Sequence, residues 1–531
     1  MWRRITLPLM AGLGLFLALA TWALSSPVGS APDDTYHLPT IWCSWGEHEA
    51  CGRAASGSFT APQVVAETCL IQQSSRSASC TYLQSEDLVI APHLFFVETP
   101  EEMSGEALTK LRGNDPYHRV LRVFVGPNAE TSALTMRIAN VSIAVGLFVW
   151  ALLVSRPNIQ RALILSWLVV SVPLGMFILS STNPSSWAVS GVATFWAFLY
   201  AVVRPVGDSL RWRWLAAGGV LLSFAVAVGG RTDSLLFLAA SGIAVITMTW
   251  PTIRRNSAMK FGVLLAVVLG AVLVTFSSLS GLIQRTVAGL FSPREADARL
   301  ISGGLNPTVN HILELPSFIW AFVGGQNPDF AFPTAFSRGL GWTDTGIPSL
   351  VGVFTLFSVA IVFAWGFGSY GLRKIVAFVG LCLVLVLAVL LPLQGVNFAP
   401  TYILQPRYFL AALYVTVAIA AIRPMMGSRL RFVPLTAIVA LVTIANAAAS
   451  LAFLHRYTNG ESVPWMRLDL EPNWWWLWLP IGPNVVWVIG ALGFMLFGLT
   501  AALVARGRFH GRDRIPVQQA LQRVKADDAE V

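Results

Sequence analysis

Runs of apolar residues recur along almost the whole chain, and each run is long enough to cross a lipid bilayer. A hydrocarbon core of about 30 Å needs roughly 20 apolar residues in a helix, and these runs hold about 17 to 23. The pattern predicts an all-α integral membrane protein with about twelve transmembrane helices. The runs lie near residues 7–24, 133–154, 161–180, 187–203, 212–229, 234–250, 260–278, 347–369, 374–393, 408–423, 431–453 and 484–505.

The composition supports the membrane class. Of the 531 residues, 55% are hydrophobic and only 12% are charged, whereas soluble domains carry about 25% charged residues. The net charge of +9 does not indicate nucleic acid, because the Arg and Lys residues lie in short clusters between the apolar runs. Clusters in such places are topology signals. We therefore expect membrane lipid, and not nucleic acid, as the surroundings of this chain.

The positive charges alternate along the chain in a way that predicts its orientation. Arg3 and Arg4 precede the first run, and every second short connection after it is basic. The short connections 181–186 and 394–406 contain neither Lys nor Arg. By the positive-inside rule, this pattern predicts a multi-pass protein of the plasma membrane with both termini in the cytoplasm.

The first run and the later connections divide the chain into six predicted segments. The basic start and the stretch Ala18-Leu19-Ala20 also fit a cleaved signal peptide, but the run is long enough to span the membrane and many spans follow it. We therefore favour an uncleaved anchor. The six segments are the first helix (1–26), an extracytoplasmic loop (27–131), helices 2–7 (132–278), an extracytoplasmic segment with an interfacial helix (279–346), helices 8–12 (347–505) and a cytoplasmic tail (506–531).

Four of the five cysteines lie in the extracytoplasmic loop, at Cys43, Cys51, Cys69 and Cys80. An even number of cysteines in one extracytoplasmic segment indicates disulfides. We favour Cys43–Cys51 and Cys69–Cys80, because each pair closes a short local loop, although sequence does not decide between the three possible pairings. A zinc site is the alternative, but the spacings are wider than the two to four residues of zinc modules.

The polar residues that adjoin apolar runs gather on the predicted outward side. Asp33 and Asp34 lie shortly after the first run, and a charge inside the hydrocarbon costs roughly 2.5 to 3.5 kcal/mol, so two carboxylates at this boundary are unusual. The inward side has only short basic turns. This asymmetry predicts chemistry at the extracytoplasmic boundary of the membrane. The other members of this outward set are His37, Arg137, Asn183, Arg231, Asp233, Asp344 and Arg407.

Such a set suits a substrate that is part lipid and part polar, such as a sugar carried on a polyprenyl phosphate. Arg231 and Arg407 are candidates for binding the phosphate, because guanidinium groups hold phosphate bidentately. Asp34 is the first candidate for the general base that takes a proton from an acceptor hydroxyl, and Asp33 is the second. The rest of the outward set is expected to contact the substrate.

Structural roles are open for the same residues. Asp33 could be the N-cap of a short helix, and Arg137 could extend to lipid headgroups or pair with an acid of the loop. Trp474-Trp475-Trp476-Leu477-Trp478 is expected to form an aromatic belt before the last span. The other local alternatives are an ion pair between Arg231 and Asp233, capping by Asn183 and Asp344, hydrogen bonding by His37 and headgroup contact by Arg407.

Several stretches resemble a bacterial family of predicted membrane proteins known as domain of unknown function 2142. In addition, Asp33-Asp34 beyond the first span, opening a long outward loop, is similar to the acidic motif of the C-type glycosyltransferases. The stretches are Pro32-Asp33-Asp34-Thr35-Tyr36-His37, Met136-Arg137-Ile138-Ala139-Asn140, Asn183-Pro184-Ser185-Ser186, Arg231-Thr232-Asp233, Gly339-Leu340-Gly341-Trp342-Thr343-Asp344 and Gln405-Pro406-Arg407-Tyr408-Phe409.

The resemblance to C-type glycosyltransferases implies a polytopic fold and an inverting transfer of a sugar. The donor would be a polyprenyl-phosphate-linked sugar, the acceptor an envelope glycan, lipid or protein, and the base an Asp of the acidic motif. No Walker loop, Rossmann glycine pattern or HExxH is present in the sequence, so no cofactor is expected, and the need for a divalent metal stays open.

Two other classes of membrane protein are the alternatives: a glycolipid flippase or exporter, and a polysaccharide polymerase or ligase. No Asp, Glu, Lys or Arg lies near the middle of a predicted span. Ion-coupled transporters place ionisable groups at the membrane midplane, so their absence disfavours coupled transport. A lipid phosphate bound at Arg231 or Arg407 would favour the enzyme, and a continuous polar path to the cytoplasmic face would favour transport.

Overall fold

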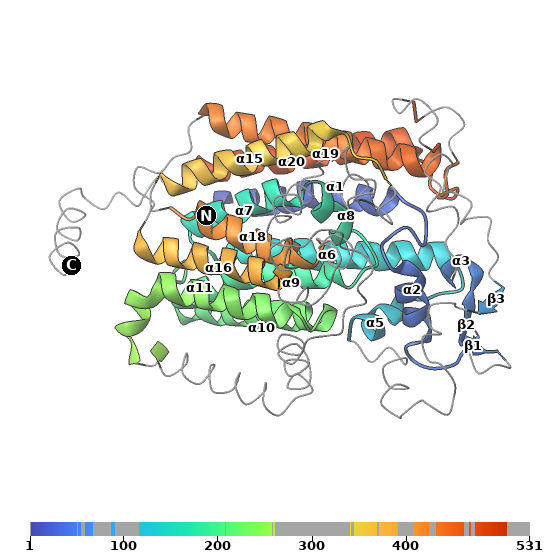
Figure 1. Cartoon of the computed structure of the whole chain (residues 1–531), viewed down its shortest axis with the longest axis horizontal. Coiled ribbons are helices and arrows are strands. Elements are labelled where there is room, and N and C mark those ends of the chain that lie inside the picture. The colour runs from blue at the N-terminus through green and yellow to red at the C-terminus, as the bar shows by residue number, and fades with distance from the viewer. Residues whose placement is uncertain are drawn as a thin grey trace, which may run out of the picture.

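The structure is a computed structural model in which apolar helices lie side by side along one direction (Figure 1). Within the residues that it describes, nine helices are long and apolar enough to cross a membrane. They are α1 (Trp2–Leu24), α6 (Ala129–Val154), α7 (Pro157–Val170) with η4 (Ser171–Gly175) and α8 (Met176–Leu179), α9 (Ser185–Val203), α10 (Leu210–Gly230), α11 (Ser234–Arg254), α15 (Ser349–Phe367), α19 (Phe432–Thr458) and α20 (Pro483–Ala505). The described residues are 2–49, 51–54, 59–66, 87–90, 116–207, 209–257, 259–260, 340, 345–368, 371–390, 407–423, 432–460, 467–468 and 473–506.

Two further apolar helices, α16 (Leu372–Leu390) and α18 (Arg407–Ala421), lie in the same bundle. Every predicted run except the one at 260–278 coincides with one of these helices. That run lies almost wholly outside the described residues, as do the interfacial helix expected within 279–346 and the tail 507–531. The prediction of a multi-pass helical membrane protein is therefore confirmed, while the count of twelve stays a prediction.

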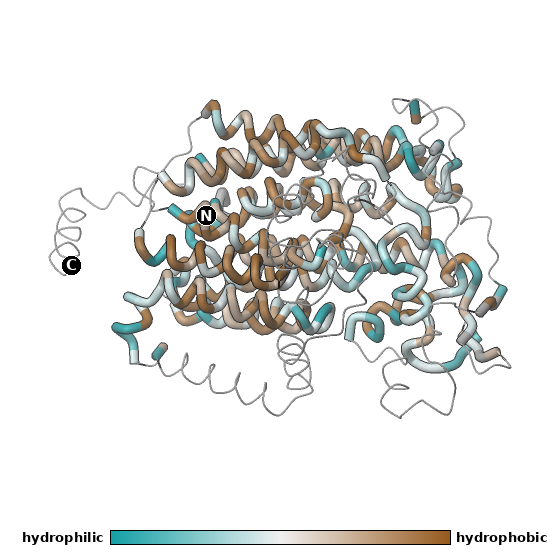
Figure 2. Tube along the Cα trace, viewed as in Figure 1, coloured by the Kyte–Doolittle hydropathy of each residue, from teal (hydrophilic) through white to brown (hydrophobic). Residues whose placement is uncertain are grey.

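The two ends of the bundle differ in polarity (Figure 2). We call the end where α1 begins and α20 ends the termini end, and the opposite end, beyond which α2 (Asp34–Cys43) and α5 (Pro116–Leu121) lie, the loop end. Connections at the termini end carry the basic residues that the charge pattern placed together: Arg156, Arg204, Arg255, Arg373 and Arg423. The alternation of charge agrees with the helix order, and the compartment that each end faces stays a prediction.

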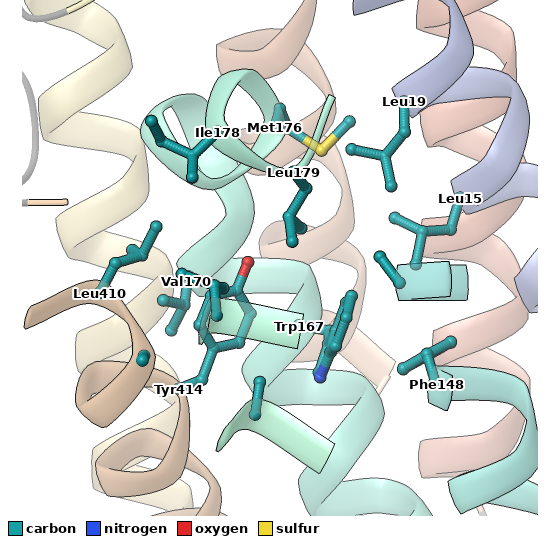
Figure 3. Close-up of a cluster of buried hydrophobic side chains, with 14 of the residues drawn as sticks. Leu15, Leu19, Phe148, Trp167, Val170, Met176, Ile178, Leu179, Leu410 and Tyr414 are labelled. Atoms are coloured by element: carbon teal, nitrogen blue, oxygen red, sulfur yellow. The ribbon is translucent and has the colours of Figure 1, made fainter. Parts of the chain in front are cut away.

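The centre of the bundle is the continuous segment α7–η4–α8, which is buried at every residue from Arg161 to Leu179. Trp167 on α7 packs against Phe148 of α6, with ring centroids 4.8 Å apart, and against Tyr414 of α18 at 5.3 Å (Figure 3). The Tyr414 hydroxyl lies 2.8 Å from Ser171 Oγ, where α7 gives way to η4. Because a buried hydroxyl needs a partner, this contact fixes α18 against the bend of the central segment.

The tryptophan stretch before α20 only partly forms the expected aromatic belt. Trp478 is exposed, but Trp475 and Trp476 are buried within the protein. Trp476 Nε1 donates to the carbonyl of Leu24, the last residue of α1, at 2.8 Å. The expectation that the whole stretch faces the lipid interface is therefore wrong, because these two indoles pack against protein.

The segment that follows α2 contains a small antiparallel sheet, so the chain is mostly helical and not all-helical. Its strands β1 (Gly52–Arg53), β2 (Phe59–Pro62) and β3 (Leu88–Ile90) pair in that order, with Gly52 opposite Thr60 and Thr60 opposite Ile90. Open sheet edges are tolerated outside the hydrocarbon, where water satisfies the backbone. The sequence pattern missed these strands because each is only two to four residues long.

A disulfide joins Cys43 at the end of α2 to Cys51, just before β1. The predicted Cys43–Cys51 pairing is therefore confirmed. Cys69 and Cys80 lie outside the described residues, so their pairing stays a prediction.

Helices α1 and α20 approach each other closely through glycines on both. A Cβ at Gly14 would lie 2.6 Å from the backbone nitrogen of Phe497, and a Cβ at Gly493 would lie 2.9 Å from that of Ala18. These distances are shorter than carbon–nitrogen contact allows. Small residues allow helix backbones to pack this closely within a membrane, so these two glycines set the position of α1 against α20.

We predict that Gly493→Ala lowers the free energy of unfolding by about 1 to 3 kcal/mol, because the added methyl forces the two backbones apart. Gly146→Ala on α6 is the matched control, since a Cβ there meets nothing within 4 Å and Ala favours a helix. Thermal unfolding of the detergent-solubilised protein, followed by tryptophan fluorescence, measures both. Equal stability of the two variants would contradict this account of the α1–α20 contact.

Candidate functional site

The turn between α1 and α2 is held by one buried arginine. The Arg137 side chain on α6 is only 1% exposed. Its Nη1 donates to the carbonyls of Ala23 at 3.0 Å and Ser26 at 2.7 Å, and its Nη2 donates to Pro27 O at 2.7 Å and Ser30 Oγ at 3.3 Å. These bonds satisfy carbonyls at and beyond the last turn of α1, which have no partner within the helix. The alternative of headgroup contact for Arg137 is therefore wrong.

Asp34, the first residue of α2, is completely buried. Its Oδ2 accepts from the backbone N–H of Ala31 at 2.9 Å, and its Oδ1 accepts from Thr182 Oγ1 at 2.6 Å. Burial raises the pKa of Asp34 to about 6, although the Arg137 charge, the Thr182 hydroxyl and the Ala31 N–H all favour the ionised form. The carboxylate therefore links the α1–α2 turn to the connection between α8 and α9.

Asn183 strengthens the same link. Its Nδ2 donates to the carbonyl of Pro32 at 2.8 Å, and its Oδ1 accepts from the backbone N–H of Ser185 at 2.9 Å. The second bond confirms the predicted local role of Asn183 at the start of α9. The first bond is a contact with the turn between α1 and α2 that carries Asp33 and Asp34, which we call the acidic turn. The sequence did not indicate this contact. Arg137 and Asn183 thus hold the backbone before Asp33, and Thr182 holds the side chain of Asp34 after it.

Asp33 has a different environment from its neighbour. Its backbone is left-handed, with φ 61° and ψ 18°, a conformation that is uncommon for a residue with a side chain. Its carbonyl accepts from the N–H groups of Tyr36 and His37, so it occupies the N-cap position of α2. The predicted N-cap position of Asp33 is therefore confirmed, although its side chain makes no capping hydrogen bond. The Asp33 carboxylate is 49% exposed and accepts from Arg407 Nη2 at 2.5 Å.

Arg407 brings the acidic turn into a larger group that we call the arginine–tyrosine cluster, made of Asp33, Arg231, Asp233, Arg407 and Tyr408. The guanidinium carbons of Arg231 and Arg407 lie 4.1 Å and 5.1 Å from the centroid of the Tyr408 ring. Arg231 binds Asp233 through Nε at 3.0 Å and through Nη2 at 2.5 Å. The cluster therefore joins the α1–α2 turn, the α10–α11 turn and the start of α18.

Two histidines lie beside this cluster. His37 Nδ1 is 3.2 Å from His118 Nε2 of α5, and the two rings are stacked. Burial lowers the pKa of His37 well below its usual value, and the nearby His118, Arg407 and Arg231 lower it further. Burial also lowers the pKa of His118 to about 4. Both rings are therefore neutral at neutral pH, with one ring donating a hydrogen bond to the other.

The predicted site residues did not include four that lie behind or beside the site: Asn140, Trp187, Tyr117 and His118. Asn140 Nδ2 donates to the hydroxyl of Tyr117 at 3.1 Å and to the carbonyl of Ser181 at 2.8 Å, and Trp187 Nε1 donates to Asn140 Oδ1 at 2.9 Å. Asn140 lies three residues after Arg137, on the same helix face. That spacing of two polar residues in an apolar run was the available signal. His118 and Tyr117 lie in the short helix α5 and had no comparable signal.

The structure brings together all the candidate residues that it describes, and Asp344 lies outside the described residues. The half-exposed Asp33 carboxylate is able to accept a proton, and two arginines beside it are able to hold an anion. Within the described residues, no three His, Cys, Asp or Glu side chains are arranged to hold a metal ion. No metal ligand is therefore assigned.

The raised pKa of Asp34 predicts a pH-dependent stability. Between about pH 4 and pH 6 the folded state keeps a proton that the unfolded chain loses, because the pKa is about 6 when folded and 3.8 when exposed. The contribution of Asp34 to the free energy of unfolding therefore falls by up to about 3 kcal/mol as the pH rises through this window. Above the window this contribution is constant. Asp34→Asn lacks this component, so its stability relative to wild type should increase between pH 4 and pH 6.

Thermal unfolding of wild type and Asp34→Asn across this range measures the difference. The comparison removes the contributions of the other carboxyl groups, because both proteins contain them. A stability difference that does not change with pH would mean that Asp34 keeps its ordinary pKa.

Comparison with known proteins agrees with the observed architecture. A family model described as "Predicted membrane protein (DUF2142)" matches residues 16–416, well over half of the chain. The match includes the acidic turn, Arg137, Asn183, both residues of the α10–α11 ion pair and Arg407. No curated protein and no solved structure matches the chain. The chain therefore belongs to the DUF2142 family of predicted membrane proteins.

Proposed function

We propose that this protein is a cell-envelope glycosyltransferase that moves a sugar from a polyprenyl-phosphate donor to an extracytoplasmic acceptor. The observation that carries the proposal is the arginine–tyrosine cluster at the loop end of an apolar bundle, in which the half-exposed Asp33 carboxylate pairs with Arg407, and Arg231 shares the Tyr408 ring with Arg407. A base and an anion site next to an apolar surface suit a substrate with a lipid tail, a phosphate and a sugar. The acceptor would be an envelope glycan, lipid or protein.

Arg231 and Arg407 are the phosphate-binding residues in this proposal. Both guanidinium groups lie over the ring of Tyr408, so the ring holds them near each other. Guanidinium groups form charge-assisted hydrogen bonds with phosphate oxygens. The sequence reasoning named these two arginines for this role, and their proximity in space supports it.

Asp33 is a better candidate for the general base than Asp34. A general base must come within hydrogen-bonding distance of the proton that it removes. Both oxygens of Asp34 are already bonded, to Ala31 and Thr182, and the side chain has no exposed surface. The Asp33 carboxylate is 49% exposed. We therefore assign the proton transfer to Asp33 and the positioning of its turn to Asp34.

The charge distribution along the described helices supports chemistry at the membrane boundary. Apart from Arg137, which lies within α6, the charged residues of these helices lie toward the helix ends, as with Arg161 on α7, Arg254 on α11 and Arg456 on α19. Coupled transporters place ionisable groups near the midplane. The apolar helix surfaces of the bundle would instead accommodate the polyprenyl tail.

We predict that Asp33→Asn reduces sugar transfer by roughly 10² to 10⁴-fold, the usual contribution of a general base. Asn is able to adopt the left-handed backbone of this position, so the turn should persist. The sugar is first identified by comparing the envelope glycans of wild-type and deletion strains. The initial rate of its transfer is then measured in membranes that contain equal amounts of each variant.

The comparison variants are Asp34→Asn, which tests the positioning residue, and Glu49→Gln, which removes an exposed carboxylate that lies outside the cluster. We expect Glu49→Gln to transfer at the wild-type rate and Asp34→Asn to be affected less than Asp33→Asn. A deletion strain that lacks the sugar while Asp33→Asn restores it fully would contradict the base assignment and favour a flippase or exporter.

A further inference from the structure

The two ion pairs of the arginine–tyrosine cluster differ in how easily an incoming anion can replace the carboxylate of the pair. Arg231 and Asp233 are two residues apart in one turn, and Asp233 receives hydrogen bonds from two nitrogens of the guanidinium group. Asp33 and Arg407 come from opposite parts of the chain and are joined through the single nitrogen Nη2. The Arg231–Asp233 pair is local and has three hydrogen bonds, whereas the Asp33–Arg407 pair has one, so an anion separates the Asp33–Arg407 pair more easily.

Charge also limits how the cluster can bind an anion. It contains two arginines and two aspartates, whose formal charges cancel, and the neighbouring His37 and His118 are neutral. An anion that simply added to this group would face two carboxylates at short range. The Arg407 side chain is only 7% exposed, so an incoming phosphate finds little of this guanidinium available unless the carboxylate beside it moves away.

We infer that the phosphate of the donor replaces Asp33 on Arg407, and that this exchange releases the Asp33 carboxylate to act as the base. The inference rests on the proposed function, and it adds that donor binding regulates when the base is available. Without donor, the Asp33 carboxylate is held in its ion pair with Arg407. With donor bound, the phosphate takes the positive charge, and the carboxylate is free beside the bound sugar.

The reaction balances under this arrangement. The acceptor O–H bond breaks and its proton goes to Asp33, while the acceptor oxygen forms a bond to the anomeric carbon of the sugar. The bond from that carbon to the phosphate oxygen breaks, and the electron pair stays with the leaving polyprenyl phosphate. Loss of the proton from Asp33 to water restores the carboxylate, which competes for Arg407 again and helps to release the product phosphate.

The exchange predicts that removing the Asp33 charge strengthens the binding of a lipid phosphate. Purified full-length protein in detergent is titrated with a polyprenyl monophosphate, and binding is measured for four forms of the protein. Asp33→Asn should bind about fivefold more tightly than wild type, since an ion pair of this exposure is worth roughly 1 kcal/mol at most. Arg407→Gln should bind about tenfold more weakly, and Glu49→Gln should match wild type.

Thermal unfolding shows whether each variant is folded. If Arg407→Gln is not, Arg407→Lys replaces it, because Lys keeps the charge but not the planar hydrogen-bonding group, and weaker binding is again expected. Wild-type or weaker binding by folded Asp33→Asn would overturn the exchange, even if that variant loses sugar transfer as the proposed function requires. Tighter binding with an unchanged transfer rate would support the exchange and reject Asp33 as the base.

Discussion

The contacts of one buried guanidinium group determine the geometry on which the candidate site depends. Arg137 lies within α6, yet all four of its hydrogen bonds run to the end of α1 and the turn after it. Hydrogen bonds from a charged donor are worth about 1.5 to 3 kcal/mol each, more than those between neutral groups. They fix the buried start of the turn, and this turn carries both aspartates.

The same turn gives two adjacent carboxylates opposite environments. Asp34 begins α2, and its side chain is directed toward the α8–α9 connection, where Thr182 and Asn183 meet the turn. The left-handed backbone of Asp33 instead directs the Asp33 side chain toward Arg407 on α18. A residue held in a sparsely populated backbone region persists only where its surroundings fix it. Here Arg137, Thr182 and Asn183 provide those surroundings.

The fold was predictable from the sequence where a single physical signal acted over many residues. Bilayer thickness sets the length of each apolar run, and the helices coincide with the predicted runs throughout the described residues. The disulfide between Cys43 and Cys51 was also predictable, because eight residues separate them along the chain. The strands β1, β2 and β3 are too short to give a periodic signal. The burial of Trp475 and Trp476 was missed because indole rings suit both a lipid interface and a protein core.

The candidate site was predictable as a set of residues but not as an arrangement. Polar residues at the ends of apolar runs indicated Asp33, Arg231 and Arg407, since charges at a lipid boundary are costly. The different burial of Asp33 and Asp34 depends on one φ angle and on contacts with α8–α9, which are distant in sequence. Asn140 and His118 were missed because each acts only through partners on other helices. The sequence analysis therefore ranked Asp34 before Asp33 as the base, an order that the geometry does not favour.

Charge balance connects the architecture of the cluster to the chemistry proposed for it. A guanidinium group that is nearly buried at a membrane boundary needs hydrogen-bond acceptors or an anionic partner, and Asp33 is the anionic partner of Arg407. A phosphate that replaces this carboxylate keeps the arginine paired, so binding does not leave a buried charge without a partner. The carboxylate that moves away is half-exposed and is stabilised by water. The proposed exchange would therefore bind an anion and release a base in one step, at little electrostatic cost.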